Sequence, residues 1–96
     1  MDDDVKKELG TLRGMVLRWK SSYLGYASGE EGYEFLADDL SEEIARHISP
    51  YVVKLHQFNH LSNDEANGFL DYCYGQVEEL RYTLKEVNSQ KEDEHA

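Results

Sequence analysis

Two histidines four residues apart are the first candidates for chemistry in this sequence. His56 and His60 lie in a segment predicted to be helical, where four residues make about one turn, so both imidazoles would point to one side. Such a pair is half of a typical metal site, for which His47, Glu43 and Asp64 are the further ligands to consider. The segment reads His-Gln-Phe-Asn-His and lacks the glutamate of a metalloprotease helix. We therefore expect surface histidines with hydrogen-bond partners, and no metal ion or other cofactor.

The single cysteine, Cys73, is the only candidate thiol nucleophile. A reactive thiolate needs a partly exposed, electropositive setting, whereas Asp71, Tyr72 and Tyr74 surround Cys73 in the sequence. We expect it to be a small buried apolar side chain. The chain also has no glycine-rich phosphate loop and no serine-nucleophile motif, so the sequence predicts no catalytic residues and a protein that is not an enzyme.

Two glutamates spaced as Glu31-x-x-Glu34 offer a different chemistry, because two carboxylates on one helix face can share a Mg²⁺ ion. In this pair the chain resembles the all-α nucleotide pyrophosphohydrolases, which are also small, acidic and helical. The resemblance implies a second pair, Glu-x-x-Asp, on a following helix; the candidate here is Asp64-x-x-Asn67, in which asparagine replaces a charged ligand. A metal-dependent hydrolase that uses Glu31, Glu34 and Asp64 is the alternative to a non-enzymatic role.

The charge balance restricts the possible partners. The 96 residues include 20 Asp and Glu but only 10 Lys and Arg, a formal net charge of −10. Such a chain is repelled by nucleic acid and by anionic lipid, so we expect direct binding to neither. It can instead bind a basic protein surface, or mimic nucleic acid in order to block one.

The chain carries no targeting signal that we recognise. No stretch approaches the roughly 20 apolar residues that span a bilayer. The start Met1-Asp2-Asp3-Asp4 does not fit a secretory signal, which needs a basic start followed by an apolar segment. We expect a cytoplasmic protein without membrane contact.

The candidate residues above lie in or next to segments with the apolar periodicity of helices. In two segments apolar residues recur at alternating steps of four and three, a heptad pattern typical of a long helix with one apolar seam. The seam of the first segment, about 3–26, consists of Val5, Leu9, Leu12, Val16, Trp19, Tyr23 and Tyr26. The seam of the last segment, about 63–88, consists of Ala66, Leu70, Cys73, Val77, Leu80, Leu84 and Val87.

Two shorter helices are predicted between these seams. The pair Ser49-Pro50 ends the first of them and begins the second, with Ser49 as N-cap and Pro50 at the first helical position. The last helix begins at a capping box, in which Ser62 and Glu65 satisfy each other's backbone N–H groups.

The sequence therefore predicts an all-α fold, a small antiparallel bundle of four helices. It occupies a single domain over 1–88, followed by a disordered acidic tail over 89–96. Lys6, Arg13 and Lys20 are seven residues apart and form one row beside the first seam. We expect this basic row to pair with an acidic neighbouring helix.

The surface chemistry predicts a non-enzymatic protein-binding module, such as an adaptor, an inhibitor or a regulatory subunit. Seven Tyr and one Trp are many for so small a core, and both side chains suit interfaces because they bury apolar area while keeping a polar tip. We expect an acidic, aromatic-rich helical surface and a homodimer, unless both seams close within one chain. The residues expected at the dimer interface are Leu12, Val16, Trp19, Tyr23, Leu80 and Leu84.

Overall fold

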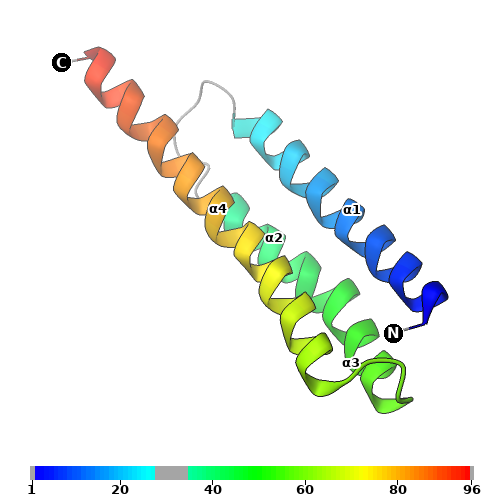
Figure 1. The fold of residues 1–96 in the computed structure, drawn as a ribbon. Coiled ribbons are helices and arrows are strands. Elements are labelled where there is room, and N and C mark those ends of the chain that lie inside the picture. Colours follow the sequence, from blue (N-terminus) through cyan, green and yellow to red (C-terminus); the bar gives the residue numbers. More distant parts are fainter. Residues whose placement is uncertain (1, 28–34, 96) are drawn as a thin grey trace.

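The computed structural model describes residues 2–27 and 35–95, with side chains placed for 2–26 and 35–86. Helix α1 spans Asp3–Ala27, α2 spans Phe35–Glu43, α3 spans Ser49–Gln57 and α4 spans Asn63–His95, while the π-helical turn η1, Ile44–Ile48, joins α2 to α3. No strand occurs in these two ranges. The all-α fold is confirmed, as are a long first and a long last helix (Figure 1).

Helices α2 and α3 and the turn between them form one continuous rod. The N–H of Ser49 donates to the carbonyl of Ile44, five residues earlier, which is the π-helical pattern. Pro50 has no N–H, and in a regular α-helix its ring would clash with the carbonyl four residues back. The wider turn just before Pro50 lets the helix continue. The predicted break at Ser49-Pro50 is therefore wrong, and the described residues form three helical rods instead of four separate helices.

The three rods lie side by side, and each one contacts both others. Figure 1 shows α1 and α4 running in the same direction, while the rod made of α2, η1 and α3 runs the opposite way. The arrangement is elongated, with extents of 56 × 18 × 18 Å. Two long helices with heptad seams are thus neighbours in parallel orientation, and the third rod is antiparallel to both.

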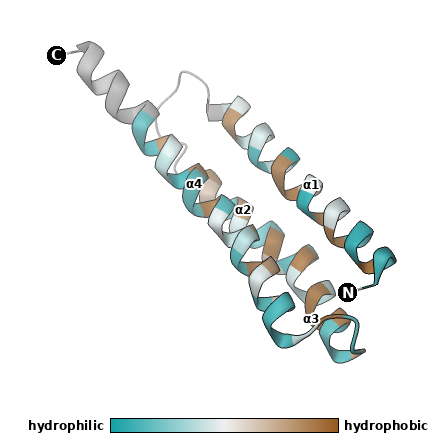
Figure 2. Ribbon diagram, in the orientation of Figure 1, coloured by the Kyte–Doolittle hydropathy of each residue, from teal (hydrophilic) through white to brown (hydrophobic). Residues whose placement is uncertain are grey.

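The core follows the predicted heptad positions closely. Figure 2 shows hydrophobic residues recurring in bands along each rod, separated by hydrophilic ones. One position in the last helix differs from the prediction, because Phe69 is buried while its neighbour Leu70 is only half-buried. Tyr26, at the end of the first seam, is exposed. The fully buried larger side chains are Val16, Leu40, Ile44, Ile48, Val52, Cys73, Leu80 and Leu84.

The backbone of α4 stays helical to His95, past residue 88, where the sequence predicts the end of the helix. Residues 89–95 contain no Gly and no Pro, so nothing in them interrupts a helix that has already begun. The division into a domain over 1–88 and a tail over 89–96 stays a prediction.

Candidate functional site

Most of the side chains expected at a dimer interface lie in the core of a single chain. Leu12, Val16, Leu80 and Leu84 are buried there. Trp19 and Tyr23 are half-buried and pack against the edge of the same core. Both heptad seams therefore close within one chain, which is the alternative that the sequence left open. The homodimer stays a prediction, and it would need other side chains than the four buried ones.

The basic row of α1 pairs with α4. The ammonium nitrogen of Lys20 donates to Oε1 of Gln76 at 3.0 Å and lies 3.4 Å from Oε2 of Glu79. The guanidinium carbon of Arg13 lies 5.1 Å from the centroid of the Tyr72 ring, a cation–π contact. The expected pairing with acidic side chains of a neighbouring helix is confirmed for Lys20, whereas Arg13 contacts an aromatic ring.

Lys6, the remaining residue of the basic row, lies near the start of α4. The pKa of Glu65 is lowered mainly by its hydrogen bonds with Ser62, and the positive charge of Lys6 adds to this effect. The pairs Lys6–Glu65, Arg13–Tyr72 and Lys20–Glu79 are each separated by the same number of residues along the chain. The packing register of helices α1 and α4 is therefore constant over these two heptads, and cations of this chain cover the side where the helices meet.

The other side of α1 carries aromatic rings next to carboxylates. The Trp19 ring lies against the imidazole of His47, with centroids 6.4 Å apart and planes inclined by 54°. Tyr23 is half-buried one turn further along α1. Its pKa is raised by burial and by the negative charges of Glu43 and Asp39 on the α2 rod. Both rings thus lie between the core and solvent, beside acidic groups.

The same side continues toward the N-terminus of α1. The Tyr51 hydroxyl donates to Oε2 of Glu8 at 3.0 Å, and this hydrogen bond is the main reason why the pKa of Tyr51 is raised. Phe58, two turns after Tyr51, is exposed. We call the surface made of Trp19, Tyr23, Tyr51, Glu8, Asp39 and Glu43 the acidic-aromatic face.

Several charges of α2 and α4 are paired within the chain. Arg81 of α4 binds Oδ1 of Asp38 at 2.9 Å and Oε1 of Glu78 at 3.3 Å. Next to the acidic-aromatic face, Nε2 of His47 lies 3.4 Å from Oε2 of Glu43. This contact is an ion pair only when the imidazole is protonated. Lys20 and Arg81 are therefore engaged in contacts with α4, and among the described residues no Lys or Arg forms an ion pair with Glu8, Asp39 or Glu43.

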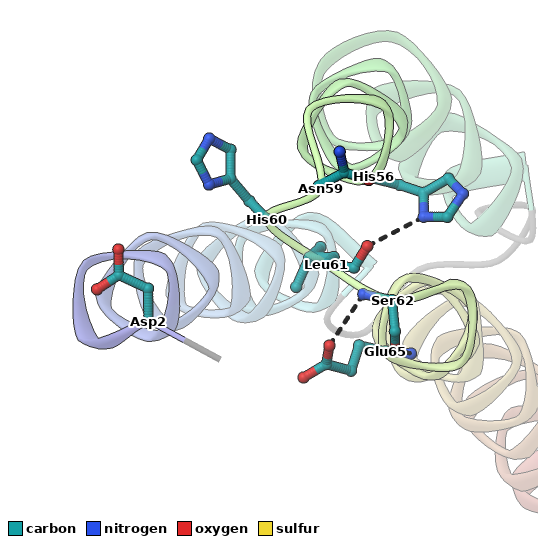
Figure 3. A pocket seen from close by; sticks show the side chains of 7 residues that line it. All are labelled: Asp2, His56, Asn59, His60, Leu61, Ser62 and Glu65. Carbon is teal, nitrogen blue, oxygen red and sulfur yellow. Dashed lines mark hydrogen bonds between the residues drawn. The ribbon is translucent and has the colours of Figure 1, made fainter.

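A hollow of about 500 Å³ lies where α3 meets α4. Helix α3 ends there in a Schellman motif: the N–H of Asn59 donates to the carbonyl of His56, and the N–H of His60 donates to that of Leu55. Asn59 has a φ of 64°, in the left-handed region that Asn tolerates better than most residues. The residues that line the hollow are Asp2, His56, Asn59, His60, Leu61, Ser62 and Glu65 (Figure 3).

The two histidines do not form a common site. Nδ1 of His56 is hydrogen-bonded to the carbonyl of Leu61 at 3.0 Å, and Figure 3 shows His60 pointing away from it. The expectation that both imidazoles point to one side is wrong, because the helix ends before His60. Among the residues that the structure describes, no group of three or more His, Cys, Asp and Glu could hold a metal ion.

The predicted capping box is confirmed at the start of α4. The N–H of Ser62 donates to Oε1 of Glu65 at 2.9 Å, and the N–H of Glu65 donates to Oγ of Ser62 at 3.1 Å. These bonds fix the loop that follows the Asn59 turn. Both side chains therefore have a structural role at the start of α4.

Cys73 is fully buried, as the sequence predicts. Burial raises the pKa of its thiol to about 11, although the charge of Arg13 acts in the opposite direction. The thiol is therefore protonated at neutral pH. Of the proposed magnesium ligands, Asp64 is exposed in the first turn of α4, while Glu31 and Glu34 lie outside the described residues.

No protein-family model, no curated protein and no solved structure matches this chain. Over the part of the chain that is described, none of the helices combines the length and the apolar character needed to cross a membrane.

Proposed function

We propose that this protein is a non-enzymatic protein-binding module, an adaptor, inhibitor or regulatory subunit, which binds its partner through the acidic-aromatic face. The observation that carries this proposal is the position of Trp19 and Tyr23. Both rings are half-buried at the edge of the core, with carboxylates beside Tyr23. Trp and Tyr are enriched in protein interfaces because they bury a large area at a small cost in conformational entropy.

The two sides of α1 differ in a way that favours this face. On the side of α4, the Lys20 side chain is only 17% exposed and is held by Gln76 and Glu79. On the side of the α2 rod, Tyr51 remains 36% exposed and Phe58 remains 65% exposed. The basic row is thus held by the chain's own α4, whereas on the side of the α2 rod aromatic side chains remain in contact with solvent.

The pairing of the acidic residues supports a binding module over a nucleic-acid mimic. A mimic needs a row of carboxylates that is free to face a basic protein. In this chain Asp38 binds Arg81, Glu42 lies 4.0 Å from Arg46, and Glu43 lies beside His47. Asp38 and Glu42 thus lie beside the chain's own arginines, and this pairing interrupts the acidic row on α2.

Two further statements belong to the same proposal. We place the protein in the cytoplasm, where a reducing environment suits a lone buried thiol such as Cys73. We also retain a homodimer as its assembly, because a folded chain of 96 residues buries a modest share of its surface and gains stability from association.

Affinity capture with matched variants tests the proposal. The full-length chain, immobilised, is exposed to lysate of its native host as wild type, Tyr51→Ser and Tyr82→Ser. Tyr82 is the control, because it is also exposed and its hydroxyl is also hydrogen-bonded to a glutamate, Glu86, but it lies on α4. We expect one protein that wild type and Tyr82→Ser retain and that Tyr51→Ser loses. Equal retention by all three chains, or none by wild type, would contradict the proposal. Mg²⁺-dependent hydrolysis of nucleoside triphosphates by the purified chain would establish the alternative, the hydrolase.

A further inference from the structure

We propose that the partner of the acidic-aromatic face is a basic amphipathic helix, which lies along α1 and the α2 rod with its Lys or Arg side chains toward Glu8, Asp39 and Glu43. This inference rests on the proposed function and adds the chemical class of the partner. Three features of the face carry it: its length and shape, its charge, and its exposed rings.

The face follows one side of α1 along its border with the α2 rod. Glu8, Trp19 and Tyr23 are separated by three turns and then one turn of α1, so they share one side of that helix. Tyr23 lies 15 residues after Glu8, which corresponds to about 22 Å at 1.5 Å per residue. Contacts from Tyr51 to Glu8 and from His47 to Trp19 show that the α2 rod borders this side along the same stretch. A partner helix of about 15 residues matches the length of this border.

The charge of the face selects a basic partner. Glu8 and Asp39 form no ion pair with a Lys or Arg among the described residues, and Glu43 is paired with a histidine. The whole chain carries a net charge of −10, so a second copy would bring like charges together on this face. Lys or Arg side chains in those positions would instead gain from the field of the face and of the whole chain.

The rings supply the other half of the recognition. Trp19 and Tyr23 offer apolar area for the Leu or Ile side chains of a partner helix, and their faces attract cations within about 6 Å. The chain already uses this chemistry on its other side, where Arg13 lies over Tyr72. A partner helix with alternating apolar and basic positions would match rings and carboxylates together.

A peptide titration read through Trp19 tests the inference on the full-length chain. Trp19 is the only tryptophan in the chain, and it lies on the face, so its fluorescence reports directly on occupation. The probe is a synthetic peptide of three heptads, with Leu at the seam positions and Lys elsewhere. A second peptide has Glu in place of every Lys. We expect a saturable blue shift of the Trp19 emission with the Lys peptide and none with the Glu peptide.

Charge-matched variants separate the face from the general acidity of the chain. We expect the double variant Glu8→Gln, Asp39→Asn to weaken binding of the Lys peptide by about fivefold, the effect of two exposed ion pairs. The control Asp71→Asn, Glu86→Gln removes the same two charges from exposed positions on α4 and should change the affinity less than twofold. Equal weakening by both double variants, or no binding of the Lys peptide, overturns the inference. If the peptide fails while Tyr51→Ser still loses the host protein, the proposed function stands and the partner is not a basic helix.

Discussion

Replacement of Lys20 by Met removes a charge that the structure places between α1 and α4, and keeps most of the side-chain stem. Lys20 donates to Oε1 of Gln76 at 3.0 Å, and a hydrogen bond of this kind contributes about 1 kcal/mol. Its ion pair with Glu79 at 3.4 Å is worth less, about 0.5 kcal/mol, because Glu79 is 65% exposed and screened by water. We therefore expect Lys20→Met to lower the free energy of unfolding by about 1.5 kcal/mol. In a domain of this size that corresponds to roughly 6–12 °C in Tm.

Urea unfolding followed by circular dichroism measures this loss, and Arg46→Met is the matched control. Arg46 lies 4.0 Å from Glu42, and the two side chains are 68% and 67% exposed, so this substitution should cost less than about 0.5 kcal/mol. If Lys20→Met were as harmless as Arg46→Met, the parallel register of α1 and α4 would be refuted.

Three further changes test the capping box, the buried thiol and the core. Ser62→Ala should cost about 1 kcal/mol, because the N–H of Glu65 loses its acceptor, Oγ of Ser62; urea melts measure it, and an unchanged free energy of unfolding would refute the cap. In the unmodified chain the lowered Glu65 pKa contributes stability above the unfolded pKa of that carboxyl, and this stability is lost as the pH falls through the folded pKa, which urea melts at pH 7 and pH 3 compare. Cys73 should stay unmodified by a thiol reagent at pH 8 and react fully in urea; rapid native labelling would refute its burial. Val16→Glu should abolish cooperative unfolding, whereas Leu17→Glu, at a position that is 42% exposed, should not; a folded Val16→Glu chain would place Val16 outside the core.

The periodicity of the apolar residues was sufficient to predict the two long helices and most of their core positions. The steps from Val5 to Val16 and from Val77 to Leu84 are those of a helix with one buried side, and the structure buries these residues. The pair Ser62 and Glu65 was also readable, because a capping box is a local motif whose partners are three residues apart.

Two predictions were wrong because the spacing of apolar residues and histidines does not show where a helix ends. A Ser-Pro pair is compatible with a helix start and with a π-helical turn before Pro50, and the packing of the whole rod decides between them. His56 and His60 would share a side only if the helix passed Gln57, but Asn59 adopts a left-handed conformation and ends it. That Asn was the available signal, since it is a common C′ residue.

The larger uncertainty was which helix covers each seam. A heptad seam predicts that a helix buries one side, but it does not say whether the covering helix belongs to the same chain. Leu12 and Leu80 therefore fitted an interface as well as a core. The rings of Trp19 and Tyr23 are only half-buried, unlike the four aliphatic residues predicted with them, and their role in an interface stays a prediction.

The most direct test of the acidic-aromatic face is an NMR titration of the ¹⁵N-labelled full-length chain with the host protein that it captures. The single Trp19 gives one indole N–H signal, which reports on the centre of the face. We expect this signal to shift together with amides in 8–23 and 39–51, while amides in 67–82 of α4 stay in place. Shifts confined to α4, or an unmoved Trp19 indole at saturation, would contradict the assignment of this face as the binding surface.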